Sequence, residues 1–213
     1  MIDFLEIHKK KSLNIDIGIR CTLQCHDCAR TRIMKRGGKI PGKDITLSQF
    51  NKISNFFKGN EIHFCGWWSD PIFNPDFIAM LEMCEAKGIT TVVHTAASHK
   101  PEKWYIEAFS RSPKAKWRFG IDGLPRNSHR YRVNQDGEKL FKIMLLAQSM
   151  GIKVEWQYII FPYNLKSVNK AKRIAAKKKI PILFIETERK EEITKILNEK
   201  KFTKQASQRA KHK

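Results

Sequence analysis

Short apolar runs and longer amphipathic runs alternate along most of this chain. The apolar runs are rich in β-branched and aromatic residues, a composition typical of strands. They span residues 13–20, 61–65, 90–95, 116–121, 153–161 and 182–186. Runs with helical spacing of apolar residues separate them. These begin at the capping-box sequence of residues 46–49 and continue at 75–87, 101–109, 137–150, 167–178 and 191–200.

The alternation predicts one α/β domain with a sheet of parallel strands. Six successive β/α units need right-handed crossovers, and 213 residues suffice for one substantial core. We expect residues 1–187 to form this core domain and residues 188–213 to form a C-terminal helix and a basic tail. The segment 31–44, which contains two adjacent glycines and several basic residues, is interpreted as a long loop.

The chain has a formal net charge of +20, much of it late in the sequence. Residues 166–213 hold 16 Lys and Arg against 5 Glu and no Asp. Such a segment can track phosphates or an acidic protein surface. The alternative is a solvated, partly disordered end that keeps the protein soluble.

The first residues lack the apolar core of a signal peptide, and no run of 18 apolar residues can span a membrane. We therefore expect a cytoplasmic monomer with no membrane contact. Its five cysteines favour metal ligation over disulfides, because the cytosol keeps thiols reduced.

Three of these cysteines, Cys21, Cys25 and Cys28, stand at C-x3-C-x2-C spacing directly after the first apolar run. Three thiolates on one loop can hold three irons of a [4Fe-4S] cluster and leave the fourth iron open. The alternatives are a structural zinc site and three unrelated buried thiols. Zinc normally takes four protein ligands, and no fourth ligand is suitably placed, because His26 lies between two of the cysteines.

This motif resembles that of the radical S-adenosylmethionine (radical SAM) superfamily, and the resemblance covers residues 13–187. It implies an open (β/α)6 partial barrel of the TIM type. It also implies two cofactors, a [4Fe-4S] cluster and S-adenosyl-L-methionine (SAM), whose amine and carboxylate bind the open iron. The reduced cluster of the family cleaves SAM to a 5′-deoxyadenosyl radical. The oxygen sensitivity typical of such clusters follows from the same resemblance.

Further segments at predicted strand ends match the family's SAM-binding motifs, since ligands gather at the carboxyl ends of parallel strands. Ser69-Asp70-Pro71 resembles the family's Gly-Glu-Pro, which implies that Ser69 and Asp70 lie near the SAM amine. Thr95 and Ser98 match two positions of a Thr-Asn-Gly-Ser segment, which implies that Thr95 lies near SAM.

The fourth apolar run ends in Asp122-Gly123, followed by Arg132, as in the Ser-Ile-Asp-Gly and Tyr-Arg pattern of peptide-modifying relatives. The resemblance implies that Asp122 lies at the SAM site and that Arg132 pairs with the SAM carboxylate. Gly120 replaces the family's ribose-contacting serine. Asn164 matches an asparagine beside the adenine and ribose.

The family's aromatic residue before the last cluster cysteine is replaced here by Asp27. Trp67, Trp68 and Phe161 are therefore the alternatives for packing on adenine, although aromatic residues at strand ends are usually core.

The resemblance favours hydrogen abstraction from a peptide or protein substrate, with electrons from a flavodoxin- or ferredoxin-like donor. No cysteine follows Cys84, so we expect the auxiliary-cluster domain of many peptide-modifying relatives to be missing. Two alternatives remain, because the charge favours polyanions. One is radical SAM modification of RNA or a nucleotide, and the other is a metal-bearing nucleic-acid-binding module without catalysis.

Overall fold

The computed structural model describes residues 11–187. Three expectations concern residues outside this range or at its end. They are the helix at 191–200, the basic tail and the domain boundary at residue 187. The described residues form six parallel strands in the order β1-β2-β3-β4-β5-β6. The strands are β1 (Ser12–Ile15), β2 (Glu61–Phe64), β3 (Thr90–Thr95), β4 (Lys116–Gly120), β5 (Lys153–Ile160) and β6 (Ile182–Glu186).

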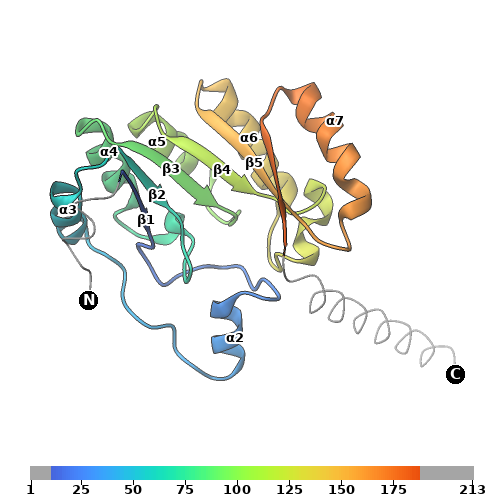
Figure 1. The fold of residues 1–213 in the computed structure, drawn as a ribbon, viewed down its shortest axis with the longest axis horizontal. Coiled ribbons are helices and arrows are strands. Elements are labelled where there is room, and N and C mark those ends of the chain that lie inside the picture. Colours follow the sequence, from blue (N-terminus) through green and yellow to red (C-terminus); the bar gives the residue numbers. More distant parts are fainter. Residues whose placement is uncertain (1–10, 188–213) are drawn as a thin grey trace, which may run out of the picture.

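Helices connect these strands, so the predicted open (β/α)6 partial barrel is confirmed (Figure 1). The α-helices are α2 (Ala29–Lys35), α3 (Leu47–Phe56), α4 (Phe77–Ala86), α5 (Glu102–Arg111), α6 (Gly137–Ser149) and α7 (Val168–Lys178). Three 3-10 turns are η1 (Pro71–Phe73), η2 (Pro125–Arg130) and η3 (Leu165–Ser167). No helix among residues 11–187 is long and apolar enough to cross a membrane.

Two sequence-based expectations fail near the cysteines. The strand expected at 13–20 ends at Ile15, because Asp16 turns its carboxylate to backbone groups of a different loop. The loop expected at 31–44 is helical as far as Lys35. Helix α2 begins directly after Cys28, and its sequence Ala-Arg-Thr-Arg-Ile-Met-Lys contains mostly good helix formers.

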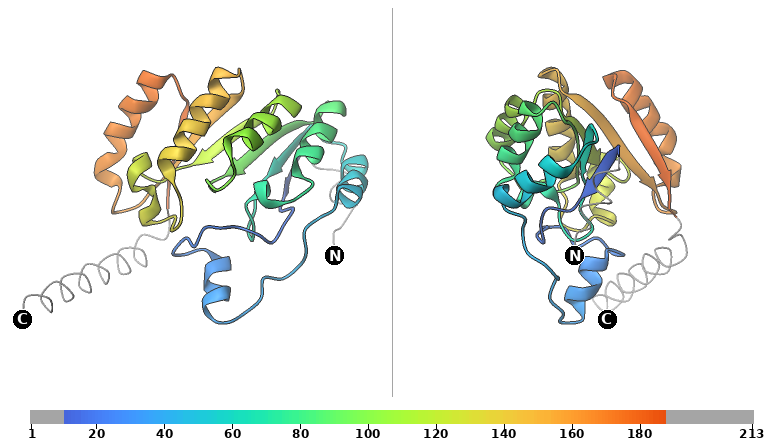
Figure 2. Two further views of the ribbon diagram at one scale, coloured as in Figure 1. Left: turned by 180° about the vertical axis from the view of Figure 1, so that it is seen from behind. Right: turned by 60° about the vertical axis from the view of Figure 1, so that its left-hand side comes forward.

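Helices α4, α5 and α6 pack on one face of the sheet (Figure 2). An aromatic cluster fills this layer, with Trp117 of β4 at its centre and Phe77 and Phe109 edge-on to it at ring distances of 6.2 and 5.0 Å. All three side chains are fully buried. Truncating such a residue to alanine typically costs about 3–5 kcal/mol, so this layer holds the strands in place.

The opposite side of the strands carries half-buried polar side chains instead, and hydrogen bonds link those of β2 with β3 and those of β4 with β5. Their residues are Glu61 and His63 of β2, His94 of β3, Lys116 and Arg118 of β4, and Glu155 and Gln157 of β5. Below the carboxyl edge of the sheet run the cysteine loop and α2 (Figure 1). The fold therefore places a polar sheet face next to the cysteines.

Candidate functional site

A cavity of about 230 Å³ opens at the carboxyl edge of the sheet. Its walls come from the cysteine loop, the loop after β2 and the ends of β3, β4 and β5. The lining residues are Cys21, Leu23, Cys25, Cys28, Arg30, Cys65, Gly66, Trp67, Trp68, Ser69, Asp70, His94, Thr95, Ala96, Arg118, Gly120, Arg132 and Gln157. Seven of the nine predicted site residues thus line one cavity, and Asp122 and Asn164 do not.

The cysteine loop is held by its backbone. The N–H groups of Gln24 and His26 donate to the carbonyls of Val133 and Tyr131, at 3.0 and 3.4 Å. Cys28 stands at the N-cap of α2, and its own N–H donates to the carbonyl of Cys25. The loop is thereby tied both to the helix that follows it and to the segment after η2.

Burial makes the first two thiols hard to ionise. Desolvation, with a smaller contribution from Asp70, raises the pKa of Cys21 to about 12. Desolvation likewise raises the pKa of Cys25 to about 11, although the nearby Arg132 opposes it. The free protein therefore keeps these thiols protonated at neutral pH, and a metal that binds them must displace protons.

Within residues 11–187, no three His, Cys, Asp or Glu side chains converge into a ready-made metal site. The donor set nevertheless suits a [4Fe-4S] cluster with one open iron, because the three thiols line the same cavity. The N–H of Leu23 also points to the Cys21 sulfur at 3.4 Å. All five cysteines are free, and Cys65 lines the cavity as well.

Asp70 joins the ends of β2 and β3. Its carboxylate accepts hydrogen bonds from the Thr95 hydroxyl at 2.9 and 3.0 Å and from the N–H groups of Ala96 and Ala97 at 2.8 and 2.9 Å. It also caps η1 through the N–H of Ile72. The side chain is buried, and this burial raises its pKa despite the hydrogen bonds.

Ser69 is positioned by Asp16. The Asp16 carboxylate accepts from the Ser69 hydroxyl at 2.6 Å and from the N–H groups of Trp67 and Trp68, each at 2.7 Å. Gly66 permits this tight turn, because a Cβ there would lie 1.9 Å from the Ser69 carbonyl oxygen. The turn leaves the Trp67 side chain 77% exposed at the rim of the cavity.

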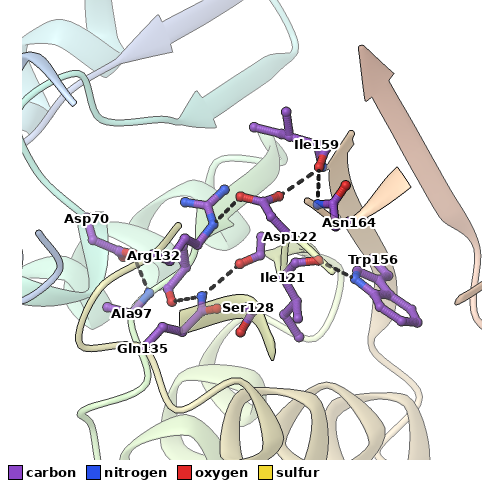
Figure 3. A network of polar contacts seen from close by, with 12 residues as sticks. Asp70, Ala97, Ile121, Asp122, Ser128, Arg132, Gln135, Trp156, Ile159 and Asn164 are labelled. Atoms are coloured by element: carbon purple, nitrogen blue, oxygen red, sulfur yellow. Dashed lines mark hydrogen bonds and ion pairs between the residues drawn. The ribbon is translucent and has the colours of Figure 1, made fainter. Parts of the chain in front are cut away.

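Arg132 pairs with Asp122, its Nε 2.7 Å from Oδ2 (Figure 3). Asp122 is fully buried and also accepts from the Ile159 N–H at 2.9 Å. Burial lowers the pKa of Arg132, but the charge of Asp122 raises it further, so the guanidinium stays protonated. Arg132 lines the cavity, whereas Asp122 orients it from behind.

Asn164 is committed to its own loop. Its amide donates to the Ile159 carbonyl at 2.9 Å and accepts from the Phe161 N–H at 2.8 Å. Phe161 is buried against Tyr131, with ring centroids 4.3 Å apart. These contacts hold the loop after β5, and neither Asn164 nor Phe161 lines the cavity. Of the three aromatic alternatives for adenine, Trp67 and Trp68 line the cavity.

Sequence reasoning missed several residues of this region. Asp16 and Gln135 belong to none of the motifs, yet the side chain of each forms hydrogen bonds with loops other than its own. The Gln135 amide donates to the carbonyls of Ala96 and Gly120, at 2.6 and 2.8 Å. Arg118 lies two positions before Gly120 on the same strand, and period-two alternation would have placed it on the cavity side.

The sequence matches no protein-family model and no curated protein. Solved structures do share the fold. Streptococcus suis SuiB bound to S-adenosylmethionine has a TM-score of 0.68 at 14% identity, over 93% of this chain and 48% of that one. Native anSMEcpe with bound AdoMet has a TM-score of 0.64 at 17% identity, over 82% of this chain and 51% of that one. Methylornithine synthase (PylB) has a TM-score of 0.62 at 12% identity, over 82% of this chain and 52% of that one.

SuiB has also been solved with the precursor peptide SuiA, and that structure gives a TM-score of 0.67 at 14% identity over 97% of this chain and 49% of the other. The chain thus spans about half the length of the structures it matches. At these identities the likeness establishes the fold.

Proposed function

We propose that this chain is the catalytic core of a radical SAM enzyme. The observation that carries the proposal is the shared cavity. Three cysteines from one loop, Asp70 from the end of β2 and Arg132 from the segment after β4 all line it. The fold that supports this cavity is also that of structures solved with S-adenosylmethionine bound.

In this proposal Cys21, Cys25 and Cys28 hold a [4Fe-4S] cluster. When bound and reduced, the cluster would supply the electron that cleaves SAM to a 5′-deoxyadenosyl radical, the species that would abstract a hydrogen atom from the substrate. The chain's own residues bind SAM, orient it and exclude water from the cavity. The proposed reductant is a flavodoxin- or ferredoxin-like protein. Five free cysteines suit the reducing cytoplasm.

Asp70 is suited to the SAM amine because its charge is uncompensated. Among the described residues its hydrogen-bond donors are neutral, namely one hydroxyl and three backbone N–H groups. Burying a carboxylate without a cation is costly, and an ammonium group in the cavity supplies the missing charge. Thr95 and Ser69 act as positioning residues, the first on Asp70 and the second in the turn above it.

Arg132 is suited to the SAM carboxylate. Its Nε faces Asp122, which leaves the two Nη atoms as the edge available to a ligand in the cavity. Planar guanidinium donors match the two oxygens of a carboxylate. Asp122 fixes the plane of this edge, and Asn164 supports the loop behind it. Trp67 offers an exposed ring at the rim for adenine or for substrate.

The proposed substrate is a peptide or protein. Structures of SuiB with the precursor peptide SuiA and of anSMEcpe with the Cp18Cys peptide support this class, because they share the fold of this chain. We propose that the protein is a monomer.

One observation favours RNA as a second candidate. Residues 166–179, on and around α7, contain seven Lys or Arg and no acid. A basic surface of this kind can bind phosphates, with an affinity that falls as salt rises. RNA binding whose log affinity is independent of log salt would remove this candidate.

Anaerobic reconstitution tests the function. We expect about four irons and four sulfides per chain and release of 5′-deoxyadenosine when a reductant and SAM are added. A colourless, zinc-loaded protein without SAM cleavage would overturn the proposal, and a coloured protein that binds SAM without cleaving it would leave a binding module.

A further inference from the structure

Arg118 contributes a cation to the cavity, and the function proposed above assigns this residue to neither cofactor. It lies on β4, and its Nε donates to Oε1 of Glu155 on the neighbouring strand β5. Its two Nη atoms have no hydrogen-bond partner within residues 11–187. Arg118 lines the cavity together with His94 and Gln157.

The charges around Arg118 do not balance. Within residues 11–187, Glu155 is the single acid that pairs with it, and the same carboxylate also accepts from Lys116 at 2.7 Å. Burial disfavours the Glu155 charge, but these two cations outweigh it and lower its pKa. Two permanent cations thus share one carboxylate, and one positive charge remains.

The remaining neighbours do not neutralise this charge. Burial, together with the charge of Arg118, lowers the pKa of His94 to about 4, so its imidazole is neutral at neutral pH. Gln157 is uncharged. Lys116 is held by Glu155, and Arg118 is the cation of this group of strand residues that lines the cavity, with its Nη edge left over from the Glu155 pair.

We propose that this edge of Arg118 binds a carboxylate of the peptide substrate, carried by an aspartate or glutamate side chain near the reacting residue. The inference rests on the proposed function and names the substrate feature that Arg118 recognises. Two Nη donors match two carboxylate oxygens. A carboxylate carries one negative charge, which matches the one positive charge left over when Lys116 and Arg118 share Glu155.

The test uses two peptides that differ in one group, acetyl-Gly-Glu-Gly-amide and acetyl-Gly-Gln-Gly-amide. Their affinities for the reconstituted protein with SAM are measured by anaerobic calorimetry. A hydrogen-bonded charge typically contributes a factor of about ten, so the wild type should prefer the glutamate peptide by about tenfold. Arg118→Gln should abolish the preference, and Arg118→Lys should retain part of it.

Glu155→Gln separates recognition from structure. The substitution removes the acid that competes for Arg118, so the preference for glutamate should increase. If Glu155 merely held Arg118 in place, its substitution would decrease the preference for the glutamate peptide. Arg111→Gln is the matched control, because Arg111 is exposed on α5 and pairs with Glu82 away from the cavity. This variant should keep the wild-type preference.

Several results would overturn the inference. They are a preference retained in Arg118→Gln, a preference lost in Glu155→Gln, or tighter binding of the matching phosphoserine peptide than of the glutamate peptide. A tenfold loss of SAM affinity in Arg118→Gln would assign the residue to the cofactor instead. If the wild type takes up neither iron nor SAM, the proposed function fails. The same peptide comparison on the SAM-free protein then decides the inference separately.

Discussion

The guanidinium of Arg132 lies directly against the backbone of Gly120. A Cβ atom at position 120 would come within 2.9 Å of its Nη2 and 3.2 Å of its Cζ. Real Cβ atoms do not approach this closely, and the Nε of Arg132 is fixed by Asp122. Gly120 is therefore the residue that makes room for this arginine.

Gly120→Ala should displace Arg132 and so weaken SAM binding. Losing a hydrogen bond to a charged group costs on the order of 1.5–3 kcal/mol, which is at least tenfold in affinity. Isothermal titration of the reconstituted protein with SAM measures this directly. The double variant with Arg132→Gln should bind no more weakly than Arg132→Gln alone, because both changes remove one contact. Additive losses would show that Gly120 acts independently of Arg132.

The strands that lie in the middle of the fold could be predicted from sequence, because their apolar runs are buried against α4, α5 and α6. The region around the cysteines could not. A strand composition continues to Arg20, but the chain leaves the sheet after Ile15, since Asp16 gains hydrogen bonds from a turn some fifty residues later. Such long-range polar contacts leave no local pattern.

The site shows the same division. Motif spacing singled out Cys21, Asp70 and Arg132, and the structure has all three lining one cavity. The spacing could not separate residues that face the cavity from those that support it, and Asp122 and Asn164 belong to the second group. That distinction depends on side-chain direction at a strand end, which a motif does not encode.

The three loop cysteines should act as one ligand set. Alanine at Cys21, Cys25 or Cys28 should lower the iron content well below about four per chain and abolish SAM cleavage. Cys65 lines the same cavity but lies outside the C-x3-C-x2-C motif, so Cys65→Ala should retain both iron and cleavage. Cys84→Ala is the control for thiol removal, because Cys84 is buried in α4. Iron loss in Cys65→Ala with full loading of Cys28→Ala would show that the ligand set is wrong.

Asp16 should stabilise the fold through its contacts with the turn after β2. Its carboxylate holds the Ser69 hydroxyl and two backbone N–H groups of the turn after β2. Asp16→Ala leaves these donors without their acceptor and should cost about 1–3 kcal/mol of unfolding free energy. Urea denaturation measures the loss. Asp136→Ala removes the N-cap of α6 and should cost about 1 kcal/mol of unfolding free energy. It is the reference with which the loss in Asp16→Ala is compared.

SAM affinity distinguishes this role from a general loss of stability. If Asp16 positions the turn that carries Ser69 and precedes Asp70, Asp16→Ala should weaken SAM binding while Asp136→Ala should not. Equal SAM affinity in the two variants would restrict Asp16 to folding.

His94 should make the protein sensitive to mild acid. Burial, with the neighbouring charge of Arg118, lowers its pKa in the folded protein from 6.5 to about 4. The unfolded chain therefore binds a proton at His94 between these pH values while the folded chain does not, and stability falls as pH decreases through this window. One proton contributes at most ~1.4 kcal/mol per pH unit, and the partial exposure of the ring reduces this.

His94→Gln should flatten the dependence of urea midpoints on pH between 6.5 and 4. Parallel curves for His94→Gln and the wild type would contradict this role of His94.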